Sequence, residues 1–281
     1  MVERMNKKNQ KKIIYDSDCF ESPMIEEFFG IRDQFYILRR LIITSFKTRY
    51  KRSYLGMVWS MLNPFLNMLV FVAVFSYFFK RNINHYAVYV LIGNMIFGFF
   101  RSSTAESMVQ MISRGPMMRR IYLPKTTYVL ASVGINLINL FLTFVPLIIV
   151  SIFDKIVMSP MMLLVFPCIL LCTIFNVGAS LIVSSVIPYV NDFSQVWNVL
   201  LTLWMYMTPI FYPESIITPQ YINLFRANPV TVYLTIFRDV YINGTSSSLQ
   251  LWITALLFAV VTFLIGWFVF TKNSNEFAYR T

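Results

Sequence analysis

Acidic side chains are scarce in this sequence, and none lies at the centre of a long apolar run. Only 13 of the 281 residues are Asp or Glu, and the single histidine, His85, lies between two apolar runs. Carriers driven by protons or sodium ions generally need an ionisable group inside the membrane. The sequence therefore disfavours a carrier of that class.

Motifs for nucleotide binding and catalysis are also missing. None of the nine glycines is followed by Lys-Ser or Lys-Thr, so there is no phosphate-binding Walker loop. A membrane-embedded transferase would need a general base and a cluster of acids or a metal, whereas His85 stands alone beside Asn84. We therefore predict no enzyme activity and no catalytic, cofactor-binding or metal-binding residue in this chain.

The sequence has only three cysteines, Cys19, Cys168 and Cys172. The last two are one helical turn apart in an apolar run, where we expect small core residues. No His or acid lies near them to complete a metal site. The first 30 residues are polar and charged, so we expect a cytoplasmic tail rather than a cleavable signal peptide.

Apolar residues dominate the chain. They make up 57% of it, and the mean hydropathy is +0.61, which is typical of an integral membrane protein. The net charge is +11, but the basic residues flank apolar runs. This placement indicates positive-inside topology rather than nucleic-acid binding.

Six runs approach the roughly 20 residues that a membrane span requires. They cover about 57–79, 86–100, 127–153, 161–187, 193–211 and 249–271, and the second is expected to extend into its polar flanks. Nineteen Lys and Arg residues fall on the side of the termini and five on the other side. We predict an all-α polytopic membrane protein with six transmembrane helices and both termini in the cytoplasm.

Two further segments are expected to be helical. Upstream of the first run, apolar residues recur every three or four positions and face a mostly basic side, which predicts an amphipathic interfacial helix over 31–55. An ordinary solvated basic helix is the alternative. The transmembrane domain would then cover 31–281. The last external loop, 212–248, is rich in both proline and apolar residues, so we expect short helices that re-enter the membrane or lie on it.

Several motifs carry a family resemblance. They are Arg49-Tyr-Lys, Tyr54-Leu-Gly-Met-Val-Trp-Ser-Met-Leu-Asn-Pro, Arg119-Arg-Ile-Tyr-Leu-Pro-Lys, Thr208-Pro-Ile-Phe-Tyr-Pro, and Asn228-Pro with Arg238-Asp downstream. In order and spacing they resemble the permease subunits of type-2 ABC exporters. The branch they resemble moves lipid-linked polysaccharides of the O-antigen, capsule and teichoic-acid type.

The resemblance implies a function and partners. The chain would be the permease of an ATP-driven exporter in the cytoplasmic (inner) membrane of a bacterium, and its cargo a polyprenyl-diphosphate-linked polysaccharide. Two copies would form a homodimer with a channel from spans one and five. Two separate ATPase subunits would bind the dimer and hold ATP and Mg. The residues expected to contact them are Lys47, Arg49, Lys51, Met117, Met118, Arg119, Arg120 and Tyr122.

Two groups of side chains are candidates for handling the cargo. The aromatic residues Phe71, Phe75 and Phe78 of span one and Trp197, Trp204 and Phe211 of span five would line the channel. Packing or interfacial anchoring is the alternative for each residue. Arg49, Lys51 and Arg52 would meet the diphosphate, since cations bind phosphate oxygens; an ATPase contact or lipid-headgroup anchoring would explain them as well.

Two other functions stay open. A type-2 ABC exporter of a smaller lipid or drug could use aromatic spans equally well. A membrane glycosyltransferase or acyltransferase is less favoured, because the chain lacks a cluster of acids facing the bilayer.

Overall fold

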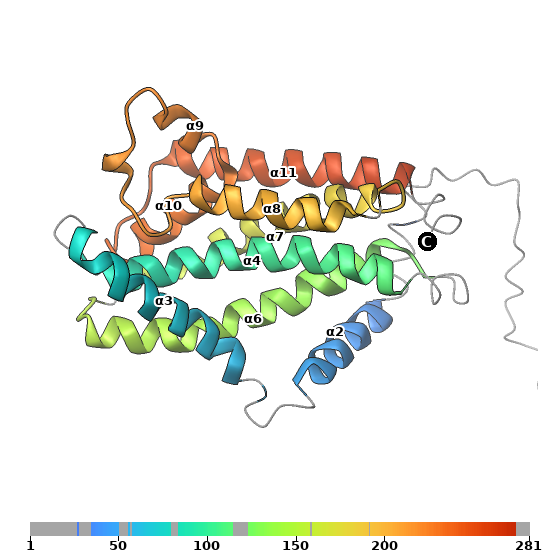
Figure 1. Ribbon diagram of the computed structural model, residues 1–281, viewed down its shortest axis with the longest axis horizontal. Helices are drawn as coiled ribbons and strands as arrows, with labels where there is room; N and C mark the ends of the chain where they lie inside the picture. The colour runs from blue at the N-terminus through green and yellow to red at the C-terminus, as the bar shows by residue number, and fades with distance from the viewer. Residues whose placement is uncertain are drawn as a thin grey trace, which may run out of the picture.

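Figure 1 shows a computed structural model of the chain. The structure describes residues 27, 35–50, 56, 58–79, 84–114, 123–157, 159–190 and 192–273, except the side chains of 75–79, 215, 223 and 224. Within these residues all regular structure is helical and no strand occurs. The prediction of an all-α chain is confirmed for this part.

The helices follow one another with short connections. They are α2 (Phe35–Tyr50), α3 (Val58–Phe79), α4 (Tyr86–Ser113), α6 (Thr126–Phe153), the 3-10 turn η1 (Pro160–Leu164), α7 (Val165–Val186), α8 (Phe193–Tyr206), η2 (Glu214–Ile216), α9 (Ile222–Arg226), α10 (Pro229–Tyr241) and α11 (Leu249–Lys272).

Helix starts follow local chemistry that the sequence contains. The Asn228 side chain accepts a hydrogen bond from the Val230 N–H, and Pro229 occupies the first helical position of α10. Ser248 caps α11 in the same way through the Leu251 N–H. Such caps satisfy backbone donors that no helical partner can reach.

Among the described residues, three helical segments are long and apolar enough to cross a membrane: Thr126–Phe153, Pro160–Val186 and Leu249–Lys272. A shorter apolar helix covers Val58–Val74. Each of the six predicted runs overlaps a helix. The helix of the fifth run, α8, has only 14 residues and ends at Tyr206 rather than near 211. At 1.5 Å per residue it is about 21 Å long, less than the roughly 30 Å of a bilayer core. Six spans therefore stay a prediction.

Proline explains why α8 stops early. Pro209 follows Thr208, and a residue before proline is disfavoured in the helical conformation. The chain then runs through non-helical backbone to η2, α9 and α10. These short helices lie within the loop at 212–248; that they re-enter the membrane or lie on it stays a prediction. They lie at the end of the bundle opposite the last turn of α11 (Figure 1).

The long helices run side by side, and α3 crosses them obliquely (Figure 1). The end of α4, the start of α6 and the end of α11 all lie at the same end of the bundle. Helix α10 packs against α4, α7 and α11. Helix α2 packs against α6, where Ile42 sits over Gly134. The predicted interfacial helix is therefore also a packed helix.

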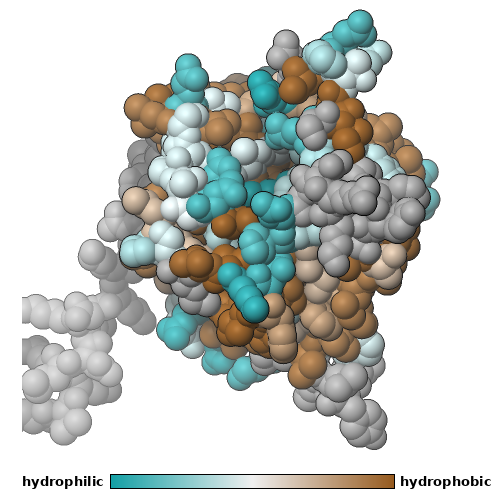
Figure 2. Space-filling model, turned by 90° about the vertical axis from the view of Figure 1, so that its left-hand side faces the viewer, coloured by the Kyte–Doolittle hydropathy of each residue, from teal (hydrophilic) through white to brown (hydrophobic). Residues whose placement is uncertain are grey.

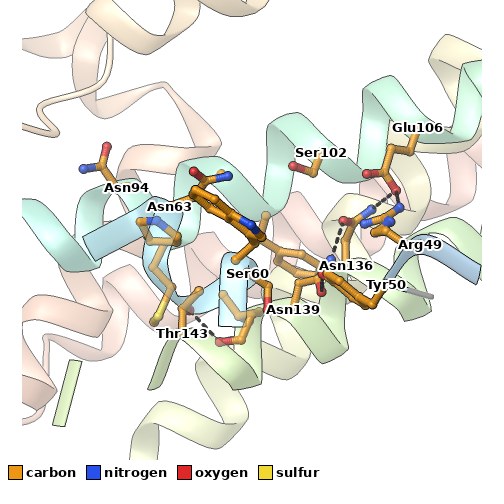
Figure 3. Close-up of a pocket in the computed structure, with 16 residues that line it drawn as sticks. Arg49, Tyr50, Ser60, Asn63, Asn94, Ser102, Glu106, Asn136, Asn139 and Thr143 are labelled. Carbon is orange, nitrogen blue, oxygen red and sulfur yellow. Dashed lines mark hydrogen bonds and ion pairs between the residues drawn. The ribbon is translucent and has the colours of Figure 1, made fainter. Parts of the chain in front are cut away.

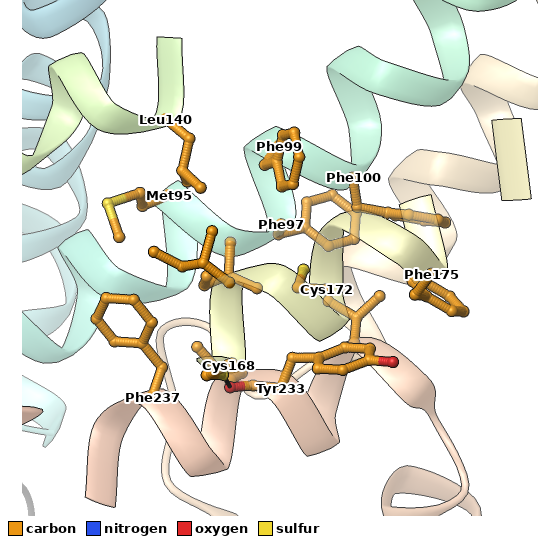
Figure 4. Close-up of a cluster of buried hydrophobic side chains, with 14 of the residues drawn as sticks. Met95, Phe97, Phe99, Phe100, Leu140, Cys168, Cys172, Phe175, Tyr233 and Phe237 are labelled. Carbon is orange, nitrogen blue, oxygen red and sulfur yellow. Dashed lines mark hydrogen bonds between the residues drawn. The ribbon is translucent and has the colours of Figure 1, made fainter. Parts of the chain in front are cut away.

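Aromatic and sulfur-containing side chains fill the core between α4, α7 and α10 (Figure 4). The Phe175 ring contacts Phe100 and Tyr233, with centroid distances of 5.7 and 5.5 Å. Cys168 and Cys172 are free and buried, and the Cys168 thiol lies 3.5 Å from the Tyr233 carbonyl oxygen. The prediction that both are small core residues is confirmed.

Candidate functional site

A cavity of about 350 Å³ lies between α2, α3, α4 and α6 (Figure 3). Four helices contribute its polar lining: Arg49 and Tyr50 from α2, Ser60 and Asn63 from α3, Asn94, Ser102 and Glu106 from α4, and Asn136, Asn139 and Thr143 from α6. Apolar lining comes mainly from Trp59, Met95, Phe99 and Leu140. We call this space the polar cavity.

Helical spacing explains why α4 is polar on this side. Asn94, Gly98, Ser102 and Glu106 are four residues apart, so they share one face. A Cβ atom built on Gly98 would meet no atom within 4 Å, so the glycine faces open space. The buried Nδ2 atom of Asn94 has no hydrogen-bond acceptor among the described residues.

An ion pair closes the end of the polar cavity nearest α2. Arg49 Nη2 lies 2.6 Å from Glu106 Oε2, and both side chains are about one-third exposed. Asn136 Nδ2 donates to the same carboxylate oxygen at 2.9 Å. The charges of Arg49 and Glu106 therefore balance each other at this end. Glu106 lies inside helix α4.

A chain of hydrogen bonds extends from this pair. The Tyr50 hydroxyl donates to Asn139 Oδ1 at 3.0 Å, and Asn139 Nδ2 donates to Asn136 Oδ1 at 3.4 Å. Together with Arg49 and Glu106, these residues join the last turn of α2 to both α4 and α6. We call the five residues the polar latch.

The structure describes only some of the residues predicted to contact the ATPase or the diphosphate. Lys47 is exposed in the last turn of α2, whereas Arg49 turns towards Glu106. The other candidates lie outside the described residues: Lys51, Arg52, Met117, Met118, Arg119, Arg120 and Tyr122. Their predicted roles stay predictions.

Predicted channel residues from the first and fifth runs meet in space. The Phe71 ring stacks on Phe211, with centroids 5.3 Å apart and planes 11° apart. The rings of Trp197 and Trp204 are 6.3 Å apart, and Trp197 Nε1 donates to Thr104 of α4 at 3.1 Å. The side chains of Phe75 and Phe78 lie outside the described residues. We call Phe71, Trp197, Trp204 and Phe211 the aromatic set. Its contacts connect α3, α4 and the segment that runs from α8 to Phe211.

Motifs far apart in sequence converge beside this set. Trp204 Nε1 donates to Asn228 Oδ1 at 2.9 Å, and Asn228 Nδ2 donates to the Thr208 hydroxyl at 2.9 Å. Asn228 therefore both caps α10 and holds the point where α8 ends.

Arg238 fixes the non-helical backbone that follows. Its side chain is buried and donates to the carbonyl oxygens of Pro209 at 2.7 Å, Ile210 at 2.9 Å and Tyr89 at 3.1 Å. The guanidinium carbon lies 3.3 Å from the centroid of the Tyr89 ring. Gly93 allows this close approach, because a Cβ there would lie 2.7 Å from Ile210 and 3.0 Å from Arg238.

The opposite end of the bundle carries a second cavity. Polar residues gather around a hollow there (Figure 2), and a space of about 560 Å³ is lined by His85, Glu214, Arg238 and Asp239 among others. His85 Nδ1 lies 3.3 Å from Asp154 Oδ2. In the part of the chain that the structure describes, no group of three or more His, Cys, Asp or Glu side chains could hold a metal ion.

Sequence reasoning missed two features of this site. The polar cavity was detectable, because Asn136, Asn139 and Thr143 share one face of an apolar run at helical spacing. The role of Glu27 had no such signal. Its carboxylate accepts from the Thr126 hydroxyl at 2.6 Å and from the Lys125 N–H at 3.3 Å, at the start of α6. Burial raises the pKa of Glu27, and the hydrogen bonds from Thr126 and Lys125 oppose that rise.

Sequence comparison relates most of the chain to known proteins. The family model described as "ABC-2 type transporter" matches residues 36–242. An O-antigen export system permease protein RfbA of Klebsiella pneumoniae is 27% identical over 236 residues, which cover 83% of this chain and 90% of that protein. A Myxococcus xanthus protein of the same name is 24% identical over 258 residues, covering 91% of this chain and 98% of its own.

The match to the family model contains α2 to α10, including the polar cavity, the aromatic set and the Arg238 contacts. The relatives extend the similarity over most of the chain. The chain is therefore a membrane protein that belongs to the ABC-2 type transporter family.

Proposed function

We propose that this chain is the membrane-spanning subunit of an ATP-driven exporter in the cytoplasmic membrane of a bacterium. Its cargo is a polyprenyl-diphosphate-linked polysaccharide of the O-antigen, capsule or teichoic-acid type. The observation that carries this proposal is the similarity, over 83% and 91% of the chain, to proteins named O-antigen export permeases. The convergence of the aromatic set supports it.

The exposed surface of α8 supports a homodimer. Its tryptophans turn towards α4, while the opposite face exposes Val199, Leu203 and Tyr206 to 70%, 57% and 60%. Helix α3 exposes Val70 and Val74 in the same way. One bundle has little room for a wide glycan path, so we propose that α3 and α8 of two copies enclose the channel. Apolar faces of this kind mark interaction surfaces or lipid contacts.

The polar latch gives ATP-driven motion a route into the bundle. Two ATPase subunits, which hold ATP and Mg, would contact Lys47, Arg49 and Lys51 near α2 and the basic loop at 117–122. Helix α4 leads to that loop and also carries Glu106, the partner of Arg49. A movement of the ATPase at either contact, near α2 or at 117–122, would therefore be transmitted to helix α4.

The diphosphate of the cargo would meet Arg49, Lys51 and Arg52 at this end. Because Arg49 is paired with Glu106, it would bind a phosphate oxygen only by exchanging partners. Neutralising all three residues should reduce export and leave dimer assembly intact. Unchanged export would remove them from the site.

The first test is tagged purification of this chain from its native membranes, with mass spectrometry of everything retained. We expect a Walker-motif ATPase in roughly equal amount, together with a bound polyprenyl-linked glycan. A smaller lipid in place of the glycan would favour an exporter of small molecules. Recovery of the chain alone in mild detergent would contradict the transporter and reopen the membrane-enzyme alternative.

A further inference from the structure

We propose that the polar cavity binds a neutral sugar ring, and specifically a ring of the lipid-linked cargo. The cavity measures about 350 Å³, within the range of about 300–1,000 Å³ that is usual for small-molecule sites. The identity of the cargo rests on the proposed function. The preference for a neutral sugar rests on the cavity itself.

Hydrogen-bonding chemistry points to hydroxyl groups. Amides and hydroxyls line the cavity from four helices, and these groups both donate and accept hydrogen bonds, as sugar hydroxyls do. Asn94 contributes a buried donor without an acceptor among the described residues. A ligand hydroxyl would supply the missing acceptor, and a buried donor left unpaired is costly.

Charge argues against an anionic ligand in the same space. Among the residues that the structure describes, Arg49 is the one cation that lines the cavity, and its charge is balanced by Glu106 at 2.6 Å. A phosphate entering beside this pair would meet a carboxylate as well as a guanidinium. The cavity therefore suits an uncharged ring.

The shape of the cavity is maintained by particular residues. Gly98 leaves open space where any other residue would project a side chain, and Trp59 and Phe99 provide apolar walls for the C–H faces of a ring. Polar groups inside the membrane are energetically costly, so their presence there generally marks a functional site. The neighbouring Arg49 belongs to the predicted diphosphate entrance, so we place here the sugar next to the lipid carrier.

The experiment measures binding to the purified transporter complex in nanodiscs. Two synthetic lipids are compared: polyprenyl diphosphate carrying one neutral hexose, and bare polyprenyl diphosphate. Wild type should bind the hexose-bearing lipid about tenfold more tightly, equivalent to one or two net hydrogen bonds. Asn94→Leu should abolish this preference and keep the affinity for the bare lipid.

Two further variants separate loss of the site from loss of the fold. Gly98→Leu fills open space with apolar atoms, so it should also remove the preference while the complex stays assembled. Asn243→Leu is the matched control, because it makes the same substitution as Asn94→Leu at an exposed position in the turn before α11. It should bind both lipids as wild type does.

Each outcome decides the proposal. Equal binding of the two lipids by wild type would overturn the sugar site and leave the exporter proposal standing. Binding of neither lipid would overturn the sugar site, while recovery of the ATPase tests the exporter separately. In a third arm, a monohexosyl diacylglycerol that bound as tightly as the diphosphate-linked sugar would support a sugar site but assign it to membrane glycolipids.

Discussion

Two sides of this bundle are built in opposite ways. Helices α7 and α11 meet through Gly178 and Gly266, whose backbones are in direct contact; a Cβ on Gly178 would lie 2.5 Å from the Thr262 carbonyl oxygen. Helices α2 and α3 instead meet α4 and α6 around a cavity with the polar latch at one end. Close packing leaves no room between the first pair, whereas open space separates the second set.

This difference assigns mechanical roles to the two sides. A close-packed interface of small residues resists sliding, because any shift brings backbone atoms into collision. A cavity bounded by polar contacts can change shape by exchanging hydrogen bonds. We therefore expect the α7–α11 pair to stay fixed during transport, and α2 and α3 to move.

Gly266→Ala is expected to have the largest effect. Its added methyl would collide with the Gly178 backbone, so the helices must separate. Overpacking costs about 1–3 kcal/mol where side chains can yield, and backbone cannot. We expect a loss of more than about 3 kcal/mol of unfolding free energy, measured as a lower midpoint of thermal unfolding in detergent.

Gly98→Ala is the matched control on the other side of the bundle. Its methyl would enter open space, and alanine stabilises a helix interior by about 0.5–1 kcal/mol relative to glycine. Equal or higher thermal stability is therefore expected. If both alanine variants unfolded at the same temperature, the contrast between the two sides would be wrong.

The sequence allowed the helical class, the apolar runs and the family motifs to be predicted, because apolar periodicity and local motifs are encoded over short distances. Thr208-Pro209 could have predicted the early end of α8. The prediction instead followed the apolar residues, which continue to Phe211. The polar latch was not predictable in the same way. Arg49 and Glu106 are 57 residues apart, and only tertiary packing brings them together.

Arg238→Leu should have the next largest effect. Removing the guanidinium leaves the carbonyl oxygens of Pro209 and Ile210 buried without their donor. Hydrogen bonds to charged groups are worth about 1.5–3 kcal/mol, so we expect a loss of about 3 kcal/mol, read from thermal unfolding. Arg226→Leu, which removes an exposed arginine from α9, should cost little. Equal effects of the two variants would exclude the clamping role of Arg238.

The polar latch should contribute less, because its ion pair is partly exposed. A double-mutant cycle with Arg49→Gln and Glu106→Gln should give a coupling energy of about 0.2–1 kcal/mol, reduced by salt. Arg39→Gln, at an exposed position of the same helix, should show no coupling to Glu106→Gln. Strong coupling that salt left unchanged would mean that the pair is a rigid element, contrary to the mobility expected of this side.

The smallest effect concerns Glu27, whose carboxylate contacts the start of α6. Because burial raises the pKa of Glu27 in the folded chain, this group stabilises the fold fully below its ordinary pKa of 4.5. That stabilisation is lost as pH rises through the raised pKa. Burial lowers the pKa of the neighbouring Lys125, and the charge of Glu27 opposes that shift.

Glu27→Gln should therefore flatten the pH dependence of thermal unfolding above pH 4.5, whereas Asp192→Asn at an exposed site should not. The glutamine keeps a carbonyl oxygen that can accept from Thr126, so the attachment itself should survive. Protease cleavage of the N-terminal segment would report that attachment directly. Equal protection of that segment below and above pH 4.5 in wild type would show that its contact with α6, the helix common to the cavity and the core, does not depend on the charge of this carboxylate.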